Sequence, residues 1–254
     1  MTKTMKGSVL ITGASGGFGL YFAKELEKQG YRLILHGRDA ARLKLVQDVL
    51  IHPEKHRVLM YELSARKGID QLLECLLNEH MVGLVNNAGF GVWGGFEICE
   101  SVAQLDVLRV DLVAPITLAH ALLPKLKKNK GFIINVSSLA GEMPMPYMST
   151  YGSAKAGLTF WSEALRSELH GKVKVVTLAP GPSPTGFRNI SGAPKGKGGW
   201  FSTRPEKVIE ASLQTLSQGG GYCVPGWRHQ CLWGFQKIVP RCVALPLLKY
   251  YLKP

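Results

Sequence analysis

The sequence predicts one doubly wound α/β domain, in which a mostly parallel seven-stranded sheet carries helices on both faces. Three observations predict this fold. Short apolar, β-branched stretches alternate along the chain with longer stretches of helical periodicity. A glycine-rich turn joins the first apolar stretch to the first helical one. The chain has 254 residues, 46% of them apolar, and α/β folds of this size commonly form one domain.

The first half of the chain alternates strands and helices at short intervals. The expected strands are short runs of mostly aliphatic residues, and the stretches between them have helical periodicity. Gly30 suits the end of the first helix, and Asp39 suits the N-cap of the second. We expect strands at 8–12, 31–36, 58–63 and 82–86, and helices at about 17–29, 40–50 and 68–79.

The second half continues with one long helical stretch at about 101–128, in which Pro115 predicts a kink. Residues 186–204 are rich in Gly, Pro and Lys, and we interpret them as a mobile loop that closes over a ligand. No shift in composition marks a second domain. Residues 1–226 are expected to form the main domain, and 227–254 an apolar, basic extension of it. The remaining strands are expected at 131–137, 173–178 and 221–224, with helices at about 150–170 and 205–218.

Composition narrows the class of protein. No apolar run reaches the ~18 residues of a membrane-spanning helix. Residues 1–6 lead directly into the first strand, which leaves no room for a signal peptide. The cysteines lack paired Cys-x-x-Cys spacing, so we expect reduced thiols in a cytoplasmic protein and no metal site. The cysteines are Cys75, Cys99, Cys223, Cys231 and Cys242.

The chain is strongly basic. It has 31 Lys and Arg against 18 Asp and Glu, which gives a net charge of +13, and no acidic residue follows Glu210. A basic surface suits nucleic acid, anionic lipid or a phosphorylated ligand. No nucleic-acid-binding motif accompanies the charge, so we expect no nucleic-acid partner.

The first motif with chemical meaning is the glycine-rich turn between the first strand and the first helix. Glycines at these positions let the backbone turn tightly and approach a pyrophosphate at the helix N-terminus. A tight turn without a ligand is the alternative, and the strand–turn–helix context disfavours it. The turn predicts a dinucleotide site that includes Gly13, Ser15, Gly17, Phe18 and Gly19.

The end of the second strand indicates which dinucleotide is bound. Sites for NAD usually carry an acidic residue here, which bonds the ribose 2′-hydroxyl. This chain has Gly37 at that place, followed by Arg38. An arginine offers a forked donor to a 2′-phosphate, so the sequence favours NADP(H) as the cofactor. In the alternative interpretation, Arg38 is a solvated residue beside the Asp39 cap.

Ser138, Tyr151 and Lys155 form the decisive group. Tyr151 and Lys155 are four residues apart and therefore share one face of a helix. A free phenol has a pKa of about 10, and a nearby ammonium lowers it, which would make Tyr151 a usable acid or base. Ser138 ends the fifth expected strand, where its hydroxyl can hold a carbonyl oxygen. These residues predict an oxidoreductase in which Tyr151 exchanges a proton with the substrate oxygen.

With these residues, the chain resembles the classical short-chain dehydrogenase/reductase family, which has a Rossmann fold. The resemblance covers residues 7–226 and is nearest to a bacterial subgroup of broadly described reductases. It implies that residues 1–226 are the dinucleotide-binding catalytic domain, and that the protein is a homodimer or homotetramer assembled through the long helices. It also implies that Tyr151 and Lys155 contact the cofactor, together with Glu62, Asn87, Ala88, Gly89, Pro180, Gly181 and Thr185.

One position departs from the family pattern. Family members usually have an asparagine in the middle of the long helix, where it holds a water linked to the catalytic lysine, and Asp111 aligns with it. A carboxylate can still accept a bond from that water, so we include Asp111 among the catalytic residues. Its charge would favour a protonated Lys155 and oppose a Tyr151 phenolate, unless burial protonates it. In the alternative interpretation, Asp111 serves only the structure of the helix.

The substrate is expected beyond the carboxyl ends of the strands, where doubly wound sheets bind ligands. Aromatic and methionine side chains in the loops there suit an apolar carbonyl compound. The sequence predicts NADPH-dependent reduction of a ketone or aldehyde. Reductases of carrier-bound acyl chains or of lipid or steroid carbonyls are alternatives, and so is a non-catalytic NADP(H)-binding sensor. The candidate contacts, for each of which core packing is the alternative, are Phe90, Trp93, Met143, Met145, Tyr147, Phe187 and Trp200.

The last segment, residues 227–254, combines apolar and aromatic residues with basic ones and contains no acid. Pro240 and Pro246 are expected to break any single helix, which leaves short amphipathic pieces. Such pieces suit a peripheral membrane contact. Packing over the substrate site or against a neighbouring subunit is the alternative that we favour.

Overall fold

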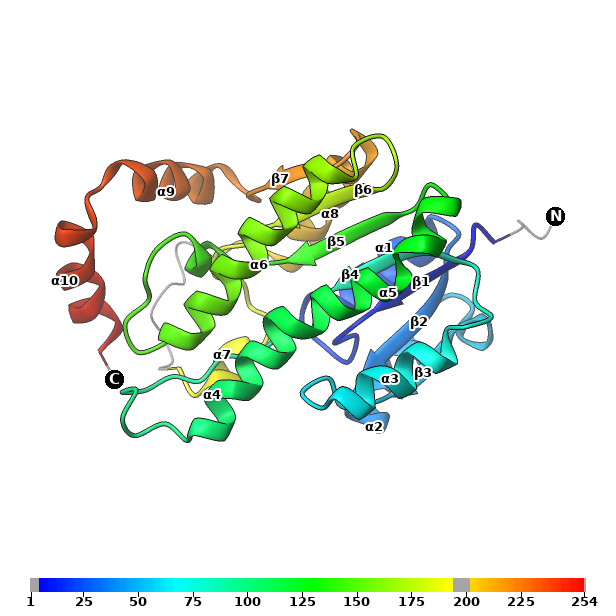
Figure 1. The fold of residues 1–254 in the computed structure, drawn as a ribbon, viewed down its shortest axis with the longest axis horizontal. Helices are drawn as coiled ribbons and strands as arrows, with labels where there is room; N and C mark the ends of the chain where they lie inside the picture. Colours follow the sequence, from blue (N-terminus) through cyan, green and yellow to red (C-terminus); the bar gives the residue numbers. More distant parts are fainter. Residues whose placement is uncertain (1–4, 194–201, 254) are drawn as a thin grey trace.

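The computed structural model describes residues 5–193 and 202–253 (Figure 1). Trp200 and residues 194–201 of the expected loop lie outside this part of the chain. Within it, seven strands form one sheet in the order β3-β2-β1-β4-β5-β6-β7, and every neighbouring pair is parallel. This confirms the predicted doubly wound sheet. The strands are β1 Ser8–Ile11, β2 Arg32–Gly37, β3 Arg57–Met60, β4 Met81–Asn86, β5 Phe132–Val136, β6 Lys174–Leu178 and β7 Gly221–Cys223.

Helices cover both faces of the sheet because successive strand residues point to opposite sides. In β1, Val9 and Ile11 enter one core and Leu10 enters the other. The first core packs α1, α2 and α8 against the sheet, and the second packs α3, α5 and the end of α6. The helices are α1 Phe18–Lys28, α2 Ala40–Asp48, α3 Arg66–Cys75, α4 Ser101–Leu108, α5 Ala114–Lys128, α6 Ser149–Glu168, α7 Phe187–Ser191, α8 Pro205–Ser217, α9 Trp227–Ile238 and α10 Arg241–Leu252.

Two boundaries differ from those expected from the sequence. β3 ends at Met60 rather than at residue 63, because its partner strand β2 ends at Gly37, which pairs with Met60. α3 ends at Cys75 rather than at residue 79. Beyond it, the ammonium of Lys125 donates hydrogen bonds to the carbonyl oxygens of Leu76 and Leu77. A side chain from α5 therefore replaces the next turn of helix as the partner of these carbonyls.

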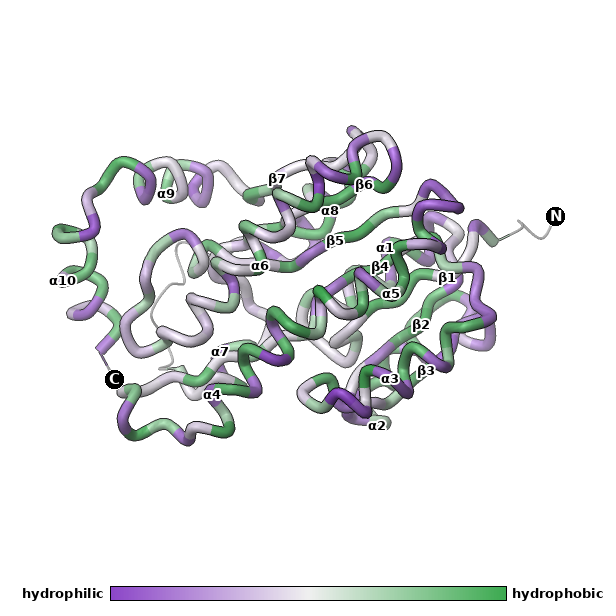
Figure 2. The backbone as a smooth tube through the Cα atoms, in the orientation of Figure 1, coloured by the Kyte–Doolittle hydropathy of each residue, from purple (hydrophilic) through white to green (hydrophobic). Residues whose placement is uncertain are grey.

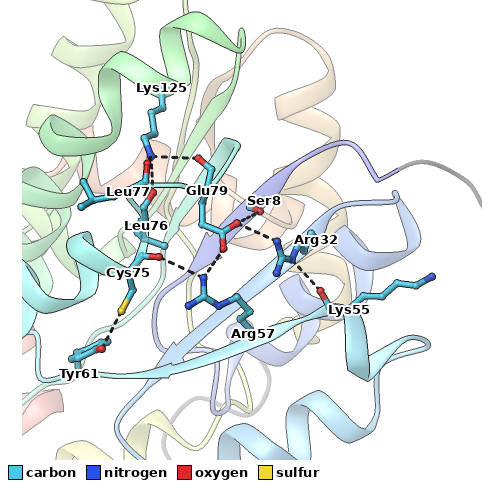
Figure 3. Close-up of polar contacts among 10 residues, drawn as sticks. All are labelled: Ser8, Arg32, Lys55, Arg57, Tyr61, Cys75, Leu76, Leu77, Glu79 and Lys125. Carbon is cyan, nitrogen blue, oxygen red and sulfur yellow. Dashed lines mark hydrogen bonds and ion pairs between the residues drawn. The ribbon is translucent and has the colours of Figure 1, made fainter.

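The turn between α3 and β4 also contains a buried carboxylate that joins three strands (Figure 3). Glu79 accepts a hydrogen bond from Ser8 Oγ in β1 at 2.9 Å. It also accepts bonds from Arg32 Nη1 in β2 at 3.3 Å and from Arg57 Nη1 in β3 at 2.5 Å. The cluster links the amino-terminal ends of three neighbouring strands, at the edge of the sheet opposite to their carboxyl ends.

The long helix is interrupted where Pro115 predicted a kink. α4 passes into a π-helical turn, η2 Arg109–Val113, before α5 begins. Pro115 has no N–H to donate to the carbonyl of Asp111, four residues earlier, so the regular ladder of hydrogen bonds opens there. Asp111 lies in this wider turn and is fully buried.

The stretch Ser101–Lys128 is also the one described helix that is long and apolar enough to cross a membrane, with a mean hydropathy of 1.5. Asp106, Arg109 and Asp111 interrupt this stretch, so it is not an uninterrupted apolar run of ~18 residues. Its apolar side chains Leu118, Leu122 and Leu126 pack into the second core, against the sheet. The apolar composition of this helix thus serves the interior of the α/β fold.

The C-terminal segment forms two helices rather than several short pieces. Pro240 separates α9 from α10, as expected. Pro246 lies inside α10 without ending it, which corrects the expectation that it breaks the helix. A proline removes one backbone hydrogen bond, and the leucine-rich turns on either side continue the helix. Figure 1 shows α9 leaving the β7 side of the sheet and α10 turning away from it.

Candidate active site

The sequence-predicted site residues converge at the carboxyl ends of the strands, around the point where the strand order reverses between β1 and β4. The glycine-rich turn follows β1, and residues 87–91 follow β4. Ser138 comes shortly after β5, and residues 180–185 follow β6. Tyr151 and Lys155 lie in the first turns of α6, and Asp111 lies in η2.

The glycine-rich turn is shaped for close approach of backbone or ligand. Gly13 has φ +62°, and a Cβ there would come within 2.7 Å of Ala88 Cα. A Cβ on Gly19 would lie 2.4 Å from the carbonyl oxygen of Gly13. Gly17 has φ +56° and immediately precedes α1. The turn therefore requires glycine at these positions, and no described side chain forms a capping hydrogen bond at the α1 N-terminus, where a pyrophosphate would bind.

Asn87 holds this turn against the segment after β4. Its side-chain Nδ2 donates to the carbonyl oxygens of Thr12 (2.9 Å) and Gly13 (3.0 Å). The Thr12 hydroxyl in turn accepts hydrogen bonds from the backbone N–H groups of Asn87 and Ala88, each at 3.0 Å. Two predicted cofactor segments, far apart in the sequence, form one rigid unit. Phe18 packs partly against the first core, so its side chain supports the turn from behind.

The two residues expected at the adenosine end lie together. Arg38 Nη1 is 3.5 Å from Glu62 Oε2, and the Arg38 side chain is 66% exposed. Glu62 also accepts a hydrogen bond from the backbone N–H of Ser64. An exposed ion pair of this kind contributes only ~0–1 kcal/mol, so a phosphate can compete for the guanidinium. Gly37 keeps the end of β2 close to the turn, since a Cβ there would lie 3.3 Å from Ser15 Oγ.

A shallow hollow beside the glycine-rich turn was not anticipated from the sequence. It has a volume of about 300 Å³ and includes Ser15, Lys24 and Arg42 in its lining. Lys24 on α1 and Arg42 on α2 belong to no recognisable motif, so the sequence does not single out these residues. A second hollow, of about 420 Å³, lies between the turn after α6 and the turn before β7 and includes Lys130, Lys172 and Lys174. It is remote from Tyr151, so we do not assign it to this site.

The serine, tyrosine and lysine come together as predicted by their spacing. The Ser138 hydroxyl lies near the Tyr151 phenol and acts to lower its pKa. Lys155 Nζ lies 5.8 Å from the centre of the Tyr151 ring and donates to the carbonyl oxygen of Val136 at 2.9 Å. Ser138 Oγ also accepts from the backbone N–H of Ala140, which orients the hydroxyl at the start of a short 3-10 turn. The phenol thus has a hydroxyl partner and a neighbouring ammonium.

Asp111 joins this group through Lys155. Its Oδ2 lies 3.1 Å from Lys155 Nζ, and both side chains are buried. Its Oδ1 accepts a hydrogen bond from the backbone N–H of Phe90 at 3.0 Å. A Cβ on Gly89 would come within 2.8 Å of Asp111 Oδ2, so the backbone after β4 closes directly over the ion pair.

The electrostatics differ from the expectation that Lys155 lowers the pKa of Tyr151. Burial raises the pKa of the Tyr151 phenol, and the Asp111 carboxylate raises it further, while the Ser138 hydrogen bond lowers it in part. Burial also raises the pKa of Asp111, against the opposing effects of the Lys155 charge and the Phe90 N–H. The main physical reason is burial of the phenol, and the Asp111 carboxylate paired with Lys155 adds to it.

An apolar cluster surrounds Tyr151. The predicted contacts Phe90, Trp93, Met145 and Phe187 belong to it, and the Phe187 ring lies 5.2 Å from the Tyr151 ring. Tyr147 lies next to this cluster, with φ +62°, and its carbonyl oxygen accepts a bond from the N–H of Gly94. Met143 lies outside the cluster, half-buried. Further members of the cluster are not predictable from the sequence, because their apolar spacing indicates only core packing: Val92, Val107, Leu108, Leu112 and Met148.

Parallel doubly wound sheets bind nucleotides at this edge, and the tyrosine and lysine add proton transfer to binding. The fold and the site together therefore define a dinucleotide-dependent oxidoreductase. Sequence comparison takes the assignment one step further. Residues 7–194 match the family described as short chain dehydrogenase, and the chain belongs to this family.

Individual relatives agree with the family. The chain is 33% identical over 190 residues to a 3-ketodihydrosphingosine reductase from Bacteroides thetaiotaomicron, covering 72% of this chain and 67% of that protein. It is 34% identical over 189 residues to a serine 3-dehydrogenase from Agrobacterium fabrum, covering 72% and 74%. A short-chain dehydrogenase from Sphingobium yanoikuyae, solved in complex with NADPH, has a TM-score of 0.79 at 26% identity and covers 91% of this chain and 93% of its own.

Proposed function

We propose that this protein is an NADPH-dependent reductase that converts an apolar ketone or aldehyde to an alcohol. The observation that carries the proposal is the position of Tyr151, which lies beside both Lys155 and Ser138. Its phenol is buried beside the Ser138 hydroxyl, and burial together with the Asp111 charge keeps its pKa above the ordinary value. The phenol is protonated at neutral pH and can give its proton to the carbonyl oxygen, although the raised pKa makes it a weaker acid than a free phenol.

The side chains divide the work of the reaction. Ser138 donates a hydrogen bond to the carbonyl oxygen of the substrate and polarises it. Tyr151 gives its proton to the same oxygen as negative charge develops there. Lys155, held in place by Asp111 and the Val136 carbonyl, stabilises the phenolate that remains and binds the cofactor ribose. The bound cofactor supplies the hydride that completes the reduction.

The preference for NADPH over NADH rests on Arg38. Its guanidinium is exposed directly after Gly37, the residue that replaces the acidic residue of an NAD site, and its ion pair with Glu62 is weak enough to be displaced. The structural relative from Sphingobium yanoikuyae was solved with NADPH, which agrees with this choice. The Glu62 carboxylate next to Arg38 reduces the positive charge of the site. The preference for NADPH over NADH is therefore expected to be limited.

The apolar substrate class rests on the cluster around Tyr151. Aromatic and methionine side chains there favour a molecule that buries apolar surface. The relative named 3-ketodihydrosphingosine reductase acts, by its name, on a ketone and in the reductive direction. A lipid or steroid carbonyl fits the same cluster, and a carrier-bound acyl chain is a further alternative. A non-catalytic sensor has no need of the complete Ser138, Tyr151 and Lys155 group.

We further propose a cytoplasmic homodimer or homotetramer assembled through the long helices. Five unpaired cysteines support a reducing compartment. Large apolar side chains on the outer faces of α4, η2 and α6 support assembly there. These residues are Val102, Leu105, Val113 and Phe160.

The test of the proposed function is oxidation of NADPH and NADH by the purified protein with a panel of ketones and aldehydes of increasing apolar size. Turnover with NADPH and an apolar carbonyl is expected. In the Tyr151→Phe variant, turnover is expected to fall by ~10²–10⁴-fold with cofactor affinity retained, since the change removes the proton donor and little else.

Tyr61→Phe is the matched control, because the Tyr61 hydroxyl contacts Cys75 on α3 and lies away from the site. Its turnover should equal that of the unmodified protein. Retention of more than a tenth of the activity by Tyr151→Phe would rule out Tyr151 as the acid. Cofactor binding without turnover on any member of the panel would favour the sensor.

A further inference from the structure

The outer surface of α9 and α10 is apolar in a regular pattern. On α10, Val243, Leu247, Tyr250 and Tyr251 are exposed, and their spacing of i, i+4, i+7 and i+8 places them in one stripe along the helix. Tyr250 is 86% exposed. Figure 2 shows hydrophobic segments along both helices, at the end of the molecule opposite to the N-terminus. A helix in a soluble α/β fold normally turns such a stripe toward its own core.

α9 continues this surface and has a second, covered face. Trp227, Phe235 and Ile238 are exposed, and Ile238 is 82% exposed. On the other face, Leu232 and Trp233 pack against Leu139, Ala179 and Val224. The helix is thus held to the domain through one side and is uncovered on the opposite side, so its exposed side chains are not simply the edge of an unfolded tail.

All charged residues of the segment that forms α9 and α10 are basic. Residues 227–253 contain Arg228, Lys237, Arg241, Lys249 and Lys253, and no acidic residue. Lys237 lies over the ring of Trp233 at 3.8 Å, at the border of the covered face. Two copies that met through this surface by two-fold symmetry would bring together like charges without a compensating acid. An anionic lipid surface instead complements both the apolar stripe and the basic residues.

Two side chains of α9 contact loops at the carboxyl ends of the strands, where the candidate active site lies. Trp233 Nε1 donates to Glu142 Oε2 at 3.1 Å, and its ring stacks on Tyr222 at 5.5 Å between centres. Tyr222 donates to the other oxygen of Glu142, which follows the 3-10 turn that Ser138 begins. The α9 segment therefore rests on the loop that carries Ser138.

The second contact is on the loop after β6. His229 is buried, and a Cβ on Gly181 would lie only 2.4 Å from its ring. Its Nδ1 lies 3.0 Å from the carbonyl oxygen of Pro225. Gly181 belongs to the stretch that is expected to contact the cofactor. A surface that bound to α9 and α10 would consequently lie next to the site at which substrate is reduced.

We propose that α9 and α10 form a docking surface for an anionic lipid bilayer, with the apolar stripe in the interface and the basic side chains at the headgroups. This inference rests on the proposed reductase function. The position of the surface next to the site indicates the class of substrate: a carbonyl compound that partitions into the bilayer and enters the site from it. The protein then acts as a peripheral enzyme on the membrane surface, without a spanning segment in this part of the chain.

The experiment is co-sedimentation of the full-length protein with vesicles of phosphatidylcholine mixed with phosphatidylserine, and with vesicles of phosphatidylcholine alone. We expect binding to the mixed vesicles at low salt, weaker binding at high salt, and little binding to phosphatidylcholine alone. Arg241→Glu/Lys249→Glu is expected to weaken binding by at least roughly 25-fold, given about fivefold per basic residue near an anionic surface. Ile238→Ser/Tyr250→Ser is expected to abolish binding, and both pairs replace exposed residues, so folding is retained.

Matched controls change the same chemistry elsewhere. Lys127→Glu/Lys128→Glu alters the net charge equally at the end of α5, and Ile51→Ser/Leu77→Ser removes exposed apolar residues far from the tail. Both control pairs should bind vesicles like the unmodified protein. Absence of sedimentation with the mixed vesicles would overturn the proposal, and so would equal losses in controls and tail variants.

Sedimentation velocity of the same variants tests whether a second copy of this chain, rather than a bilayer, covers the surface. If the tail variants change the oligomeric state and leave vesicle binding unchanged, the surface is a contact between copies of this chain and the lipid proposal is wrong. Vesicle binding is measured without cofactor or substrate, so it does not depend on the reductase activity. A protein that binds vesicles but reduces no carbonyl would retain the docking surface and lose the proposed function.

Discussion

At the scale of single residues, the departure from the family pattern at Asp111 has the largest chemical consequence. The family asparagine is neutral, whereas Asp111 places a carboxylate 3.1 Å from the catalytic ammonium. The carboxylate raises the pKa of Tyr151, in addition to the effect of burial. The site is therefore biased toward the protonated phenol, the form that donates in carbonyl reduction.

Asp111→Asn is expected to retain activity near neutral pH and to shift the alkaline limb of the pH profile. In reduction the active phenol is protonated, so the rate falls as pH rises through the pKa of Tyr151. Removing the Asp111 charge lowers that pKa, and the fall should begin at a lower pH. The measurement is kcat/KM for carbonyl reduction from neutral to alkaline pH.

Asp106→Asn is the control for this change, because Asp106 lies on α4 and pairs with Arg109. Its alkaline limb should coincide with that of the unmodified protein. An unshifted limb in Asp111→Asn would mean that the carboxylate is already protonated. Loss of all activity in a folded variant would mean that Asp111 itself transfers a proton.

Arg38→Ala is expected to weaken the binding of NADPH by roughly 10- to 150-fold and to leave the binding of NADH nearly unchanged. A charge-assisted hydrogen bond to a 2′-phosphate is worth ~1.5–3 kcal/mol, and NADH has no such phosphate. Fluorescence titration with both cofactors measures the effect. Arg66→Ala serves as the control, because Arg66 is also exposed and also pairs with a carboxylate, that of Asp70. Equal losses for both cofactors would assign Arg38 a structural role.

At the scale of helices and strands, the side chains that end or hold one element come from other elements that are distant in the sequence. Lys125 from α5 caps α3, and Asn87 after β4 holds the turn after β1. The π-helical turn η2 shows the same dependence, since it places Asp111 against Lys155 of α6. Elements are thus predictable from local pattern, whereas their ends and irregularities follow from their partners.

Glu79→Gln is expected to lower the free energy of unfolding by about 1–3 kcal/mol at neutral pH, because it weakens hydrogen bonds to two arginines that link β2 and β3. Burial alone would raise the pKa of Glu79. The hydrogen bonds from Arg57 and Ser8 and the charge of Arg32 outweigh burial and leave that pKa below its ordinary value. The stabilisation is therefore complete above the unfolded pKa of about 4.3 and is lost as pH falls through the lower, folded value.

Urea unfolding of both proteins at neutral and acidic pH measures this difference. The gap in stability between the unmodified protein and Glu79→Gln should narrow as the pH falls below about 4. Glu74→Gln, an exposed glutamate on α3, should change stability by less than ~0.5 kcal/mol. A gap that stays constant with pH would show that the charge on Glu79 is not the stabilising feature.

At the scale of the whole molecule, two exposed apolar surfaces call for different partners. The surface on α4, η2 and α6 is mixed in charge nearby, with Asp106 and Arg109 paired within it, and suits a second copy of the chain. The surface on α9 and α10 carries one sign of charge and suits an anionic bilayer. The two surfaces lie on different helices, so assembly and docking can coexist.

Phe160→Ser is expected to raise the dissociation constant of the proposed oligomer by at least ~10-fold, since an exposed aromatic side chain often dominates such an interface. Phe160 is 78% exposed on α6, so the substitution should not disturb the core. Sedimentation velocity over a range of protein concentrations gives the constant. Phe235→Ser on α9 is the control and should leave it unchanged, and an oligomer unaffected by Phe160→Ser would place the interface elsewhere.

The sequence by itself determined the order of strands and helices, the glycine-rich turn and the group Ser138, Tyr151 and Lys155. Each of these depends on local spacing: period two in strands, i and i+4 in a helix, and glycine where φ must be positive. The tertiary structure alone decided that Asp111 contacts Lys155 directly, that burial is the largest cause of the raised pKa of Tyr151, and which faces of α9 and α10 are covered. These properties depend on distances between segments far apart in the chain, and packing sets such distances.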